Sequence, residues 1–145
     1  MSTLVSTIAS CSSSGNAVEV SPPSLDAAGI KICRSFYGAL PDSLDGLRRR
    51  TVTPKSELTA AWGNPAVVLT CGIPRPEKMS DPNADAGTVE GVNWLMENSR
   101  DGSYRCTTTY RKVYVQVFLP EKRAHDVGTL MQLAKPIKKW IPSAL

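Results

Sequence analysis

The densest hydrophobic stretch of the chain runs from Ala60 to Pro76 and reads AAWGNPAVVLTCGIPRP. Its Gly63-Asn64-Pro65 step is typical of a turn, because proline fixes its own φ and restricts the residue before it. From Ala66 to Gly72 both alternating faces are mostly apolar, and one of them carries Val67, Leu69 and Cys71. Two apolar faces indicate a strand in the interior of a sheet. We expect Gly72 and the prolines that follow to end this strand.

Two other segments have the periodicity of amphipathic helices. Six residues near the N-terminus fall at i, i+3, i+4, i+7, i+8 and i+11 and so share one face: Leu25, Ala28, Gly29, Ile32, Cys33 and Phe36. We expect Ser24 to cap this helix at its N-terminus. A second helix is predicted from about Val127 to Ile141, and Pro136 is expected to kink or stagger it.

Three later segments alternate as strands do. Val89 to Asn98 and Tyr104 to Tyr110 are predicted to form a hairpin through the turn at Ser99 to Gly102. The next strand, Val113 to Leu119, alternates out of phase with Tyr104 to Tyr110. Either a bulge or a tight turn is therefore expected near Arg111.

These elements predict an α+β fold, in which an antiparallel sheet of about four strands carries the N-terminal and C-terminal helices on one face. Thr51 to Pro54 is consistent with a short edge strand. Pro74 to Gly87 contains three prolines and few hydrophobic residues, which predicts a loop long enough to close over a ligand. With 145 residues, of which 41% are hydrophobic, the chain can bury the core of one domain but hardly of two.

Composition narrows the range of partners. The formal charge is +4, and the positive residues are scattered apart from Arg48 to Arg50 and the Lys135 to Lys139 segment, which does not indicate nucleic acid as a partner. The four cysteines have neither CxxC spacing nor neighbouring histidines, so no metal and no cofactor is expected. The one histidine, His125, lies among charged residues and is typical of a solvated surface. No apolar run reaches the ~18 residues of a membrane-spanning helix.

The N-terminus carries a candidate lipidation motif. Ile8-Ala9-Ser10-Cys11 is similar to a bacterial lipobox, in which the cysteine receives a lipid, and Ser12 to Asn16 would then be a flexible tether. The alternative is a disordered serine-rich tail with a chance cysteine. Met1 to Ser10 lacks the basic and apolar regions of a complete signal peptide, so lipidation requires an upstream start. We therefore assign residues 1–23 to a truncated signal, lipobox and tether, and residues 24–145 to a single α+β domain.

Five segments carry a family resemblance: LPDSLDGLRRR, AAWGNPAVVLTCGIPRP, VEGVNWL, YRCTTTYRKVYVQVFLP and LAKPIKKWIP. Over about Ala28 to Pro142 the chain resembles an actinobacterial group of small cell-envelope proteins described only as a domain of unknown function. The resemblance implies an exported protein, anchored to the outer face of the cell membrane through a lipid on Cys11. It also implies counterparts of Cys33 and Cys71, whereas Cys106 and the short N-terminus depart from the family pattern.

We predict a disulfide between Cys33 and Cys71. Cys33 lies on the inward face of the first helix, and Cys71 lies on the strand face that it shares with Val67 and Leu69. The covered side of the sheet can bring the two together, and an exported domain is oxidised. The alternatives are two buried free thiols, or pairing of either cysteine with Cys106.

The residues do not assemble a nucleophile with its base, a metal cluster or a phosphate loop, so we expect a binding or accessory module rather than an enzyme. Its partner would be a cell-envelope component or envelope protein, and its only membrane contact the lipid anchor. The alternative is an envelope hydrolase that works through loop carboxylates, namely Asp45, Asp81, Asp85 and Glu90.

Aromatic residues and arginine most often anchor interfaces, and this favours Trp62 and Arg111 as partner-binding residues. Trp94 shares a strand face with Val92 and Met96 and is expected to be core. If Trp62 and Arg111 form a site, both should lie on one side of the molecule, in a partly exposed concavity lined by the Pro74 to Gly87 loop.

Overall fold

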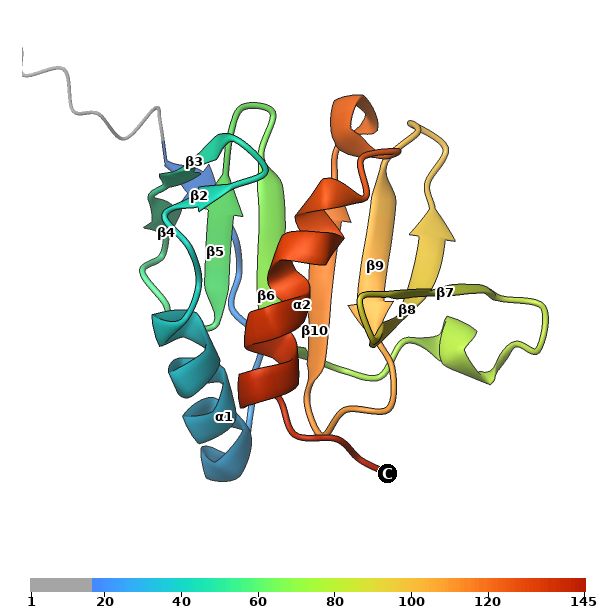
Figure 1. The fold of residues 1–145 in the computed structure, drawn as a ribbon. Helices are drawn as coiled ribbons and strands as arrows, with labels where there is room; N and C mark the ends of the chain where they lie inside the picture. The colour runs from blue at the N-terminus through green and yellow to red at the C-terminus, as the bar shows by residue number, and fades with distance from the viewer. Residues whose placement is uncertain (1–16) are drawn as a thin grey trace, which may run out of the picture.

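Two helices cover one face of a twisted sheet in the computed structural model, which describes residues 17–145 (Figure 1). The helices are α1 (Ala27–Gly38) and α2 (Gly128–Trp140), with short 3-10 turns at η2 (Glu77–Ser80) and η3 (Glu121–Arg123). The strands are β1 (Val18–Glu19), β2 (Ser43–Leu44), β3 (Leu47–Arg50), β4 (Val52–Thr53), β5 (Thr59–Trp62), β6 (Val67–Ile73), β7 (Asp85–Val89), β8 (Val92–Asn98), β9 (Tyr104–Thr108) and β10 (Tyr114–Leu119).

The main sheet has the order β2-β3-β5-β6-β10-β9-β8-β7, and every pair in it is antiparallel. The α+β class with both helices on one face is confirmed, but the expected sheet of about four strands was wrong, because the sheet has eight. The extra strands are short or polar. β2 has two residues, and β3 reads LRRR, so neither shows an apolar alternation.

The central strand is the interior strand that its two apolar faces predicted. β6 lies between β5 and β10, and Val67, Leu69 and Cys71 are buried beneath the helices. It does not end at Gly72 but continues to Ile73. Gly72 has a φ of +98°, and a Cβ there would collide with the side chain of Leu25, so both backbone and space require glycine.

The observed helices correct one expectation, the identity of the first N-cap. α1 begins at Ala27, and Asp26 rather than Ser24 caps it by accepting a hydrogen bond from the Gly29 backbone N–H at 2.8 Å. Its buried residues are Gly29, Cys33 and Phe36, which confirms the predicted inward face. α2 runs through Pro136 as one helix.

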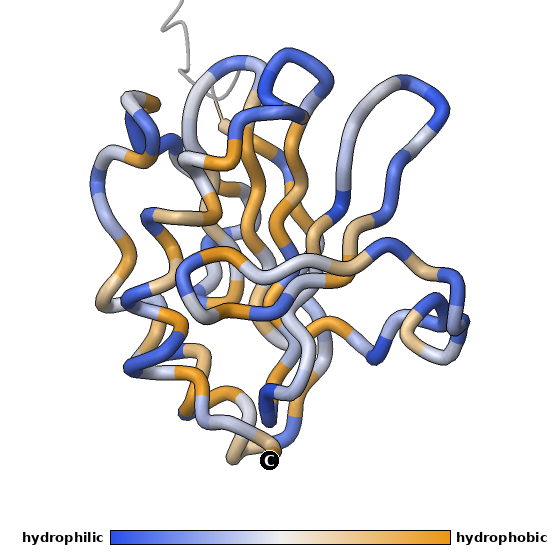
Figure 2. The backbone as a smooth tube through the Cα atoms, turned by 45° about the vertical axis from the view of Figure 1, so that its right-hand side comes forward, coloured by the Kyte–Doolittle hydropathy of each residue, from blue (hydrophilic) through white to orange (hydrophobic). Residues whose placement is uncertain are grey.

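The connection between β9 and β10 contains both a tight turn and a register shift, the two features expected as alternatives near Arg111. Tyr110 adopts a φ of +58°, which turns the chain, and the β10–β6 register shifts between Tyr114 and Val115. The expected loop from 74 to 87 is shorter than predicted, because Asp85 to Gly87 already belong to β7, which pairs with β8. Figure 2 shows that the projecting loops are mostly hydrophilic, while hydrophobic segments run along the sheet and the helices.

The first β-strand pairing in the described residues begins at Val18. β1 and β4 form a separate two-stranded parallel sheet, with Val18 opposite Val52 and Glu19 opposite Thr53. β1 lies within the segment assigned above to the signal and tether, and β4 is the short strand expected near Thr51. Cys11 and the serine tether lie outside the described residues. None of the helices in residues 17–145 is long and apolar enough to cross a bilayer.

Cys33 and Cys71 form the predicted disulfide, with their Cα atoms 5.8 Å apart. Cys106 is a free thiol, and it is buried. The bond joins α1 to the central strand and ties the helical layer to the sheet.

Candidate functional site

A cavity of about 600 Å³ lies where the 74–84 segment and the β7–β8 hairpin meet the connection between β9 and β10. Residues far apart in the sequence meet there because β7, β8, β9 and β10 are consecutive neighbours in the sheet. Its charged and aromatic lining residues are Arg75, Lys78, Asp81, Trp94, Tyr110, Arg111 and Tyr114.

The alternation of β8 determines which of its side chains face this cavity. Val92 and Trp94 belong to the hydrophobic core under the helices, so Asn93 and Leu95 point to the opposite face of the sheet, and both line the cavity. Trp94 is fully buried, as predicted, yet it also contributes to the cavity wall. Its indole N–H has no hydrogen-bond partner among the described residues.

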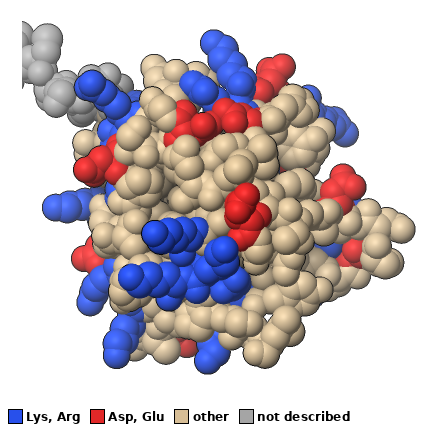
Figure 3. Space-filling view, viewed as in Figure 1, with Lys and Arg blue, Asp and Glu red and all other residues tan. Residues whose placement is uncertain are grey.

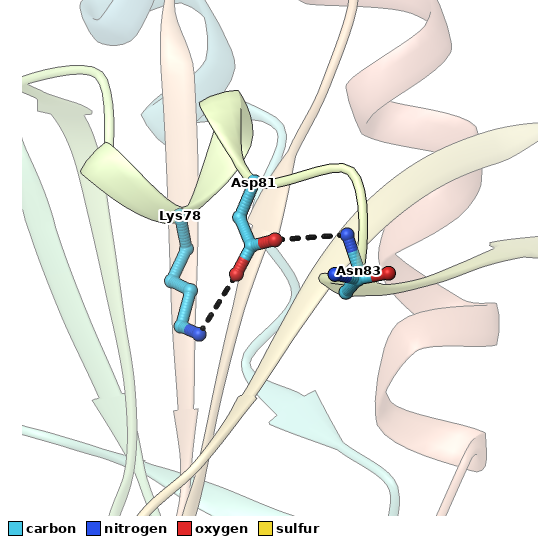
Figure 4. Close-up of polar contacts among 3 residues, drawn as sticks. All are labelled: Lys78, Asp81 and Asn83. Atoms are coloured by element: carbon cyan, nitrogen blue, oxygen red, sulfur yellow. Dashed lines mark hydrogen bonds and ion pairs between the residues drawn. The ribbon is translucent and has the colours of Figure 1, made fainter.

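The η2 segment has its own polar network (Figure 4). Lys78 Nζ lies 3.2 Å from Asp81 Oδ2, and Asp81 Oδ1 accepts a hydrogen bond from the Asn83 backbone N–H at 2.8 Å. The Asn83 N–H and then the Lys78 ammonium lower the pKa of Asp81, so its carboxylate is ionised and neutralises Lys78. Arg75 Nη1 donates to Ser80 Oγ at 2.7 Å in the same segment.

Arg111 is held by the C-terminal segment. Its Nη1 donates to the carbonyl of Ile141 at 2.9 Å, and Arg111 forms a β-bridge with Ser143. The Lys112 N–H also donates to Pro142 O at 2.9 Å, and the Ala144 N–H to Tyr110 O at 2.8 Å. These contacts fix the backbone around Arg111, a half-buried residue that lines the cavity.

The cavity has an excess of positive charge. Arg75 and Arg111 donate to a hydroxyl and to a carbonyl, and within residues 17–145 neither forms an ion pair. Tyr110, which is 58% exposed, and Tyr114 add aromatic surface. Two guanidinium groups beside two aromatic rings can bind an anionic group attached to an apolar or sugar-like body.

A family model described as "Protein of unknown function (DUF3515)" matches residues 2–145. The chain belongs to the DUF3515 family. No curated protein and no solved structure matches it. The resemblance to a family of unknown function is therefore confirmed.

The structure does not bring Trp62 and Arg111 together. In this DUF3515 chain Trp62 lies on β5 with no exposed surface, and it is absent from the cavity that Arg111 lines. Its indole N–H donates to Pro41 O at 3.0 Å, and the Arg49 guanidinium lies 5.3 Å from its ring centre. Trp62 therefore anchors the β2–β3 region to the core. The concavity with Arg111 and the 74–84 segment exists, but Trp62 lies elsewhere.

The four loop carboxylates of the hydrolase alternative do not meet in one site either. Asp81 alone of the four lines the cavity, while Asp85 begins β7 and Glu90 lies in the β7–β8 turn. The Asp45 carboxyl group instead lies beside that of Asp126, which is not among the predicted carboxylates, and each shifts the pKa of the other. Asp126 accepts the Gly128 N–H at 3.0 Å at the start of α2, and the Asp45 N–H donates to Gln132 Oε1 at 2.8 Å.

The hydrogen bond between the two carboxyl groups drives their pKa values apart. It raises the pKa of Asp45, helped by burial, and lowers the pKa of Asp126, helped by the Gly128 N–H. Asp45 therefore takes up a proton before Asp126 as the pH falls. The pair joins the β2–β3 turn to the N-terminus of α2.

Cys106 and His125 adjoin a smaller, mostly apolar cavity of about 220 Å³. Burial raises the pKa of Cys106 to about 11, which keeps the thiol protonated and unreactive. His125 is exposed, as expected, and lies edge-on to Tyr104 with ring centres 6.1 Å apart. Within residues 17–145, no three His, Cys, Asp or Glu side chains are placed to hold a metal.

Proposed function

We propose that this DUF3515 protein is a non-enzymatic binding module of the actinobacterial cell envelope, and that its 600 Å³ cavity takes an envelope component carrying a phosphate or carboxylate. The observation that carries the proposal is the presence of Arg75 and Arg111 in one cavity, where neither has a carboxylate partner among residues 17–145. A guanidinium forms paired, directional hydrogen bonds with these two anions.

The dimensions and the lining of the cavity support a small ligand or one unit of a polymer. Its volume of about 600 Å³ lies within the ordinary range for ligand sites. Tyr110 and Tyr114 offer ring faces and hydroxyl groups. Thr88, whose hydroxyl donates to Asn93 Oδ1 at 2.6 Å, also lines the cavity. A ligand with an anionic group and a hydroxyl-rich body satisfies both sets of groups.

The disulfide supports a location outside the cytoplasm, because disulfides persist in oxidising compartments. We propose that a lipid on Cys11 anchors the protein to the outer face of the cell membrane, following the lipobox-like Ile8-Ala9-Ser10-Cys11 sequence. In the full-length gene, Cys11→Ala should move the protein from the membrane fraction to the soluble fraction, whereas Ser12→Ala should not. Continued membrane association of the Cys11→Ala protein with unchanged mass would contradict lipidation.

Capture from envelope extracts tests the cavity. Immobilised wild-type full chain should retain an envelope component that Arg75→Gln retains poorly, because Arg75 is exposed and its loss leaves the core intact. Arg111→Lys should retain an intermediate amount, since it keeps the charge but not the planar fork. Arg100→Gln removes the same charge from the β8–β9 turn and is the matched control. Equal capture by all four proteins excludes the cavity as the binding site.

An envelope hydrolase is the second candidate, and the neighbouring carboxyl groups of Asp45 and Asp126 favour it. Two neighbouring carboxyl groups with different pKa values can serve as a general acid and a general base. Asp126 also lines the 220 Å³ cavity beside His125. Hydrolysis of purified cell-wall fragments that is lost in Asp126→Asn and kept in Arg75→Gln would support this candidate over the binding module.

A further inference from the structure

The charged residues of the two helices are all basic. α1 and α2 contain no Asp or Glu, and their five basic residues are all exposed: Lys31, Arg34, Lys135, Lys138 and Lys139. The whole chain is far more balanced, with 17 basic and 13 acidic residues. Figure 3 shows Lys and Arg side chains gathered over the lower part of this layer, where α1 and α2 lie side by side.

Most of these basic side chains have no ion-pair partner in residues 17–145. Arg34 pairs with Glu57 at 2.9 Å, and both side chains are more than half exposed. Within the described part of the chain, none of the four lysines forms an ion pair. The helix face therefore presents several positive charges that are not neutralised internally.

The outward face of α2 also carries apolar groups. Met131, Lys135, Lys138 and Lys139 stand at i, i+4, i+7 and i+8, which places them on one side of the helix. Met131 is 45% exposed, and Trp140 at the end of the helix is 38% exposed with Lys139 Nζ 5.2 Å from its ring centre. None of these side chains lines either cavity described above. A surface of several exposed lysines with exposed apolar groups fits an extended charged layer better than a single small ligand.

We propose that the exposed face of α1 and α2 docks on an anionic phospholipid surface and so orients the domain on the membrane. The charge is complementary to phosphate headgroups, and each lysine near such a surface contributes about 1 kcal/mol of attraction. Tryptophan and other apolar side chains favour the boundary between headgroups and acyl chains. The proposal rests on the proposed membrane location, because it acts on a domain already held near a bilayer. It adds a protein surface to the lipid anchor.

Trp140 provides a specific probe. The chain has three tryptophans, and Trp62 and Trp94 are fully buried, so a fluorescence change on docking reports on Trp140. The full chain with Cys11→Ser, which cannot carry the lipid, is mixed with vesicles of phosphatidylcholine alone or of phosphatidylcholine with phosphatidylglycerol. We expect co-sedimentation and a blue shift with the anionic vesicles only, and loss of both at high salt.

Two charge-matched variants test the surface. Lys135→Gln/Lys138→Gln/Lys139→Gln should weaken vesicle binding about a hundredfold, from the loss of three lysines. Arg105→Gln/Lys112→Gln/Lys122→Gln removes the same charge from exposed positions outside the helices and should bind as the parent does. Trp140→Phe should keep most of the sedimentation and lose the blue shift. Equal losses in both triple variants would show that net charge alone is responsible and would overturn the proposal.

Other outcomes distinguish membrane docking by the helix face from ligand binding in the cavity. Binding to neutral and anionic vesicles alike, or to soluble polyphosphate but not to vesicles, overturns membrane docking by the helix face. Failed vesicle binding with Arg75-dependent envelope capture overturns the docking proposal and leaves the cavity function standing. Vesicle binding that Arg75→Gln leaves intact supports docking even when capture by the cavity fails.

Discussion

The sulfur atoms of Cys33 and Cys71 are bonded to each other, which fixes the middle of α1 against the central strand β6. The two cysteines are 38 residues apart in the sequence, and the segment between them contains β2, β3, β4 and β5. Those strands are short, so the cross-link closes a loop that has few long pairings of its own.

We predict that Cys33→Ala/Cys71→Ala lowers the free energy of unfolding by about 4 kcal/mol, chiefly because the unlinked chain gains conformational freedom when it unfolds. Urea denaturation of the oxidised wild type and of the double variant measures the difference. A reducing agent should destabilise the wild type by a similar amount and leave the double variant unchanged. Equal stability of the oxidised wild type and the variant would contradict a stabilising cross-link.

Trp62 is predicted to act in stability and not in binding. Trp62→Phe removes the hydrogen bond to Pro41 O and weakens the stacking of Arg49, so the free energy of unfolding should fall by about 1–2 kcal/mol. Capture of the envelope component should be unchanged at temperatures where the variant is folded. Normal stability with lost capture would instead place Trp62 in the binding site.

The Asp45–Asp126 pair predicts a specific dependence of stability on pH. The raised pKa of Asp45 means that its contribution is present below the ordinary value of 3.8 and is lost as pH rises through its folded pKa. The lowered pKa of Asp126 means that its contribution is present above 3.8 and is lost as pH falls through its folded pKa. The pair is therefore most stabilising between the two folded pKa values, where it holds a single proton.

Asp45→Asn should keep a donor to Asp126 at every pH and remove the repulsion at neutral pH. Asparagine also tolerates the positive φ of 49° at this position. We expect the variant to be more stable than the wild type by about 0.5 kcal/mol at neutral pH, with the difference shrinking towards acid pH. Chemical denaturation across the pH range measures this, with Asp85→Asn as the charge-matched control. A difference that does not vary with pH would show that the pair does not share a proton.

Periodicity located the long elements of the fold but not the short ones. β6, β8 and both helices were predictable because each buries a regular face over several residues. β3 has no such face, because its sequence LRRR shows no apolar alternation, and it becomes a strand by pairing with β5, with Arg49 opposite Trp62 and Arg50 opposite Ala61. The predicted loop includes Asp85 to Gly87 of β7, because the sequence DAGTV has little hydrophobic pattern and forms a strand only by pairing with β8.

The candidate site was only partly predictable for a related reason. Arg111 stood out because the alternation changes phase beside it, and the structure places Arg111 at the cavity wall. Arg75 and Lys78 carry no local signal, since they reach Arg111 only through the order of four antiparallel strands. Trp62 stood out as an aromatic residue beside a turn. Its position in the sequence does not indicate whether the ring points outward or inward.

Anion binding in the Arg75–Arg111 cavity is most directly tested by recording nuclear magnetic resonance spectra of the isotope-labelled full chain with Cys11→Ser. The probes are glycerol phosphate and glucuronate, with neutral glycerol and glucose as controls. The account predicts that both anions shift the amide signals of residues 75–81 and 109–111, that the neutral compounds do not, and that Arg75→Gln abolishes the shifts. Absence of shifts in these segments, or shifts confined to α2, would contradict it.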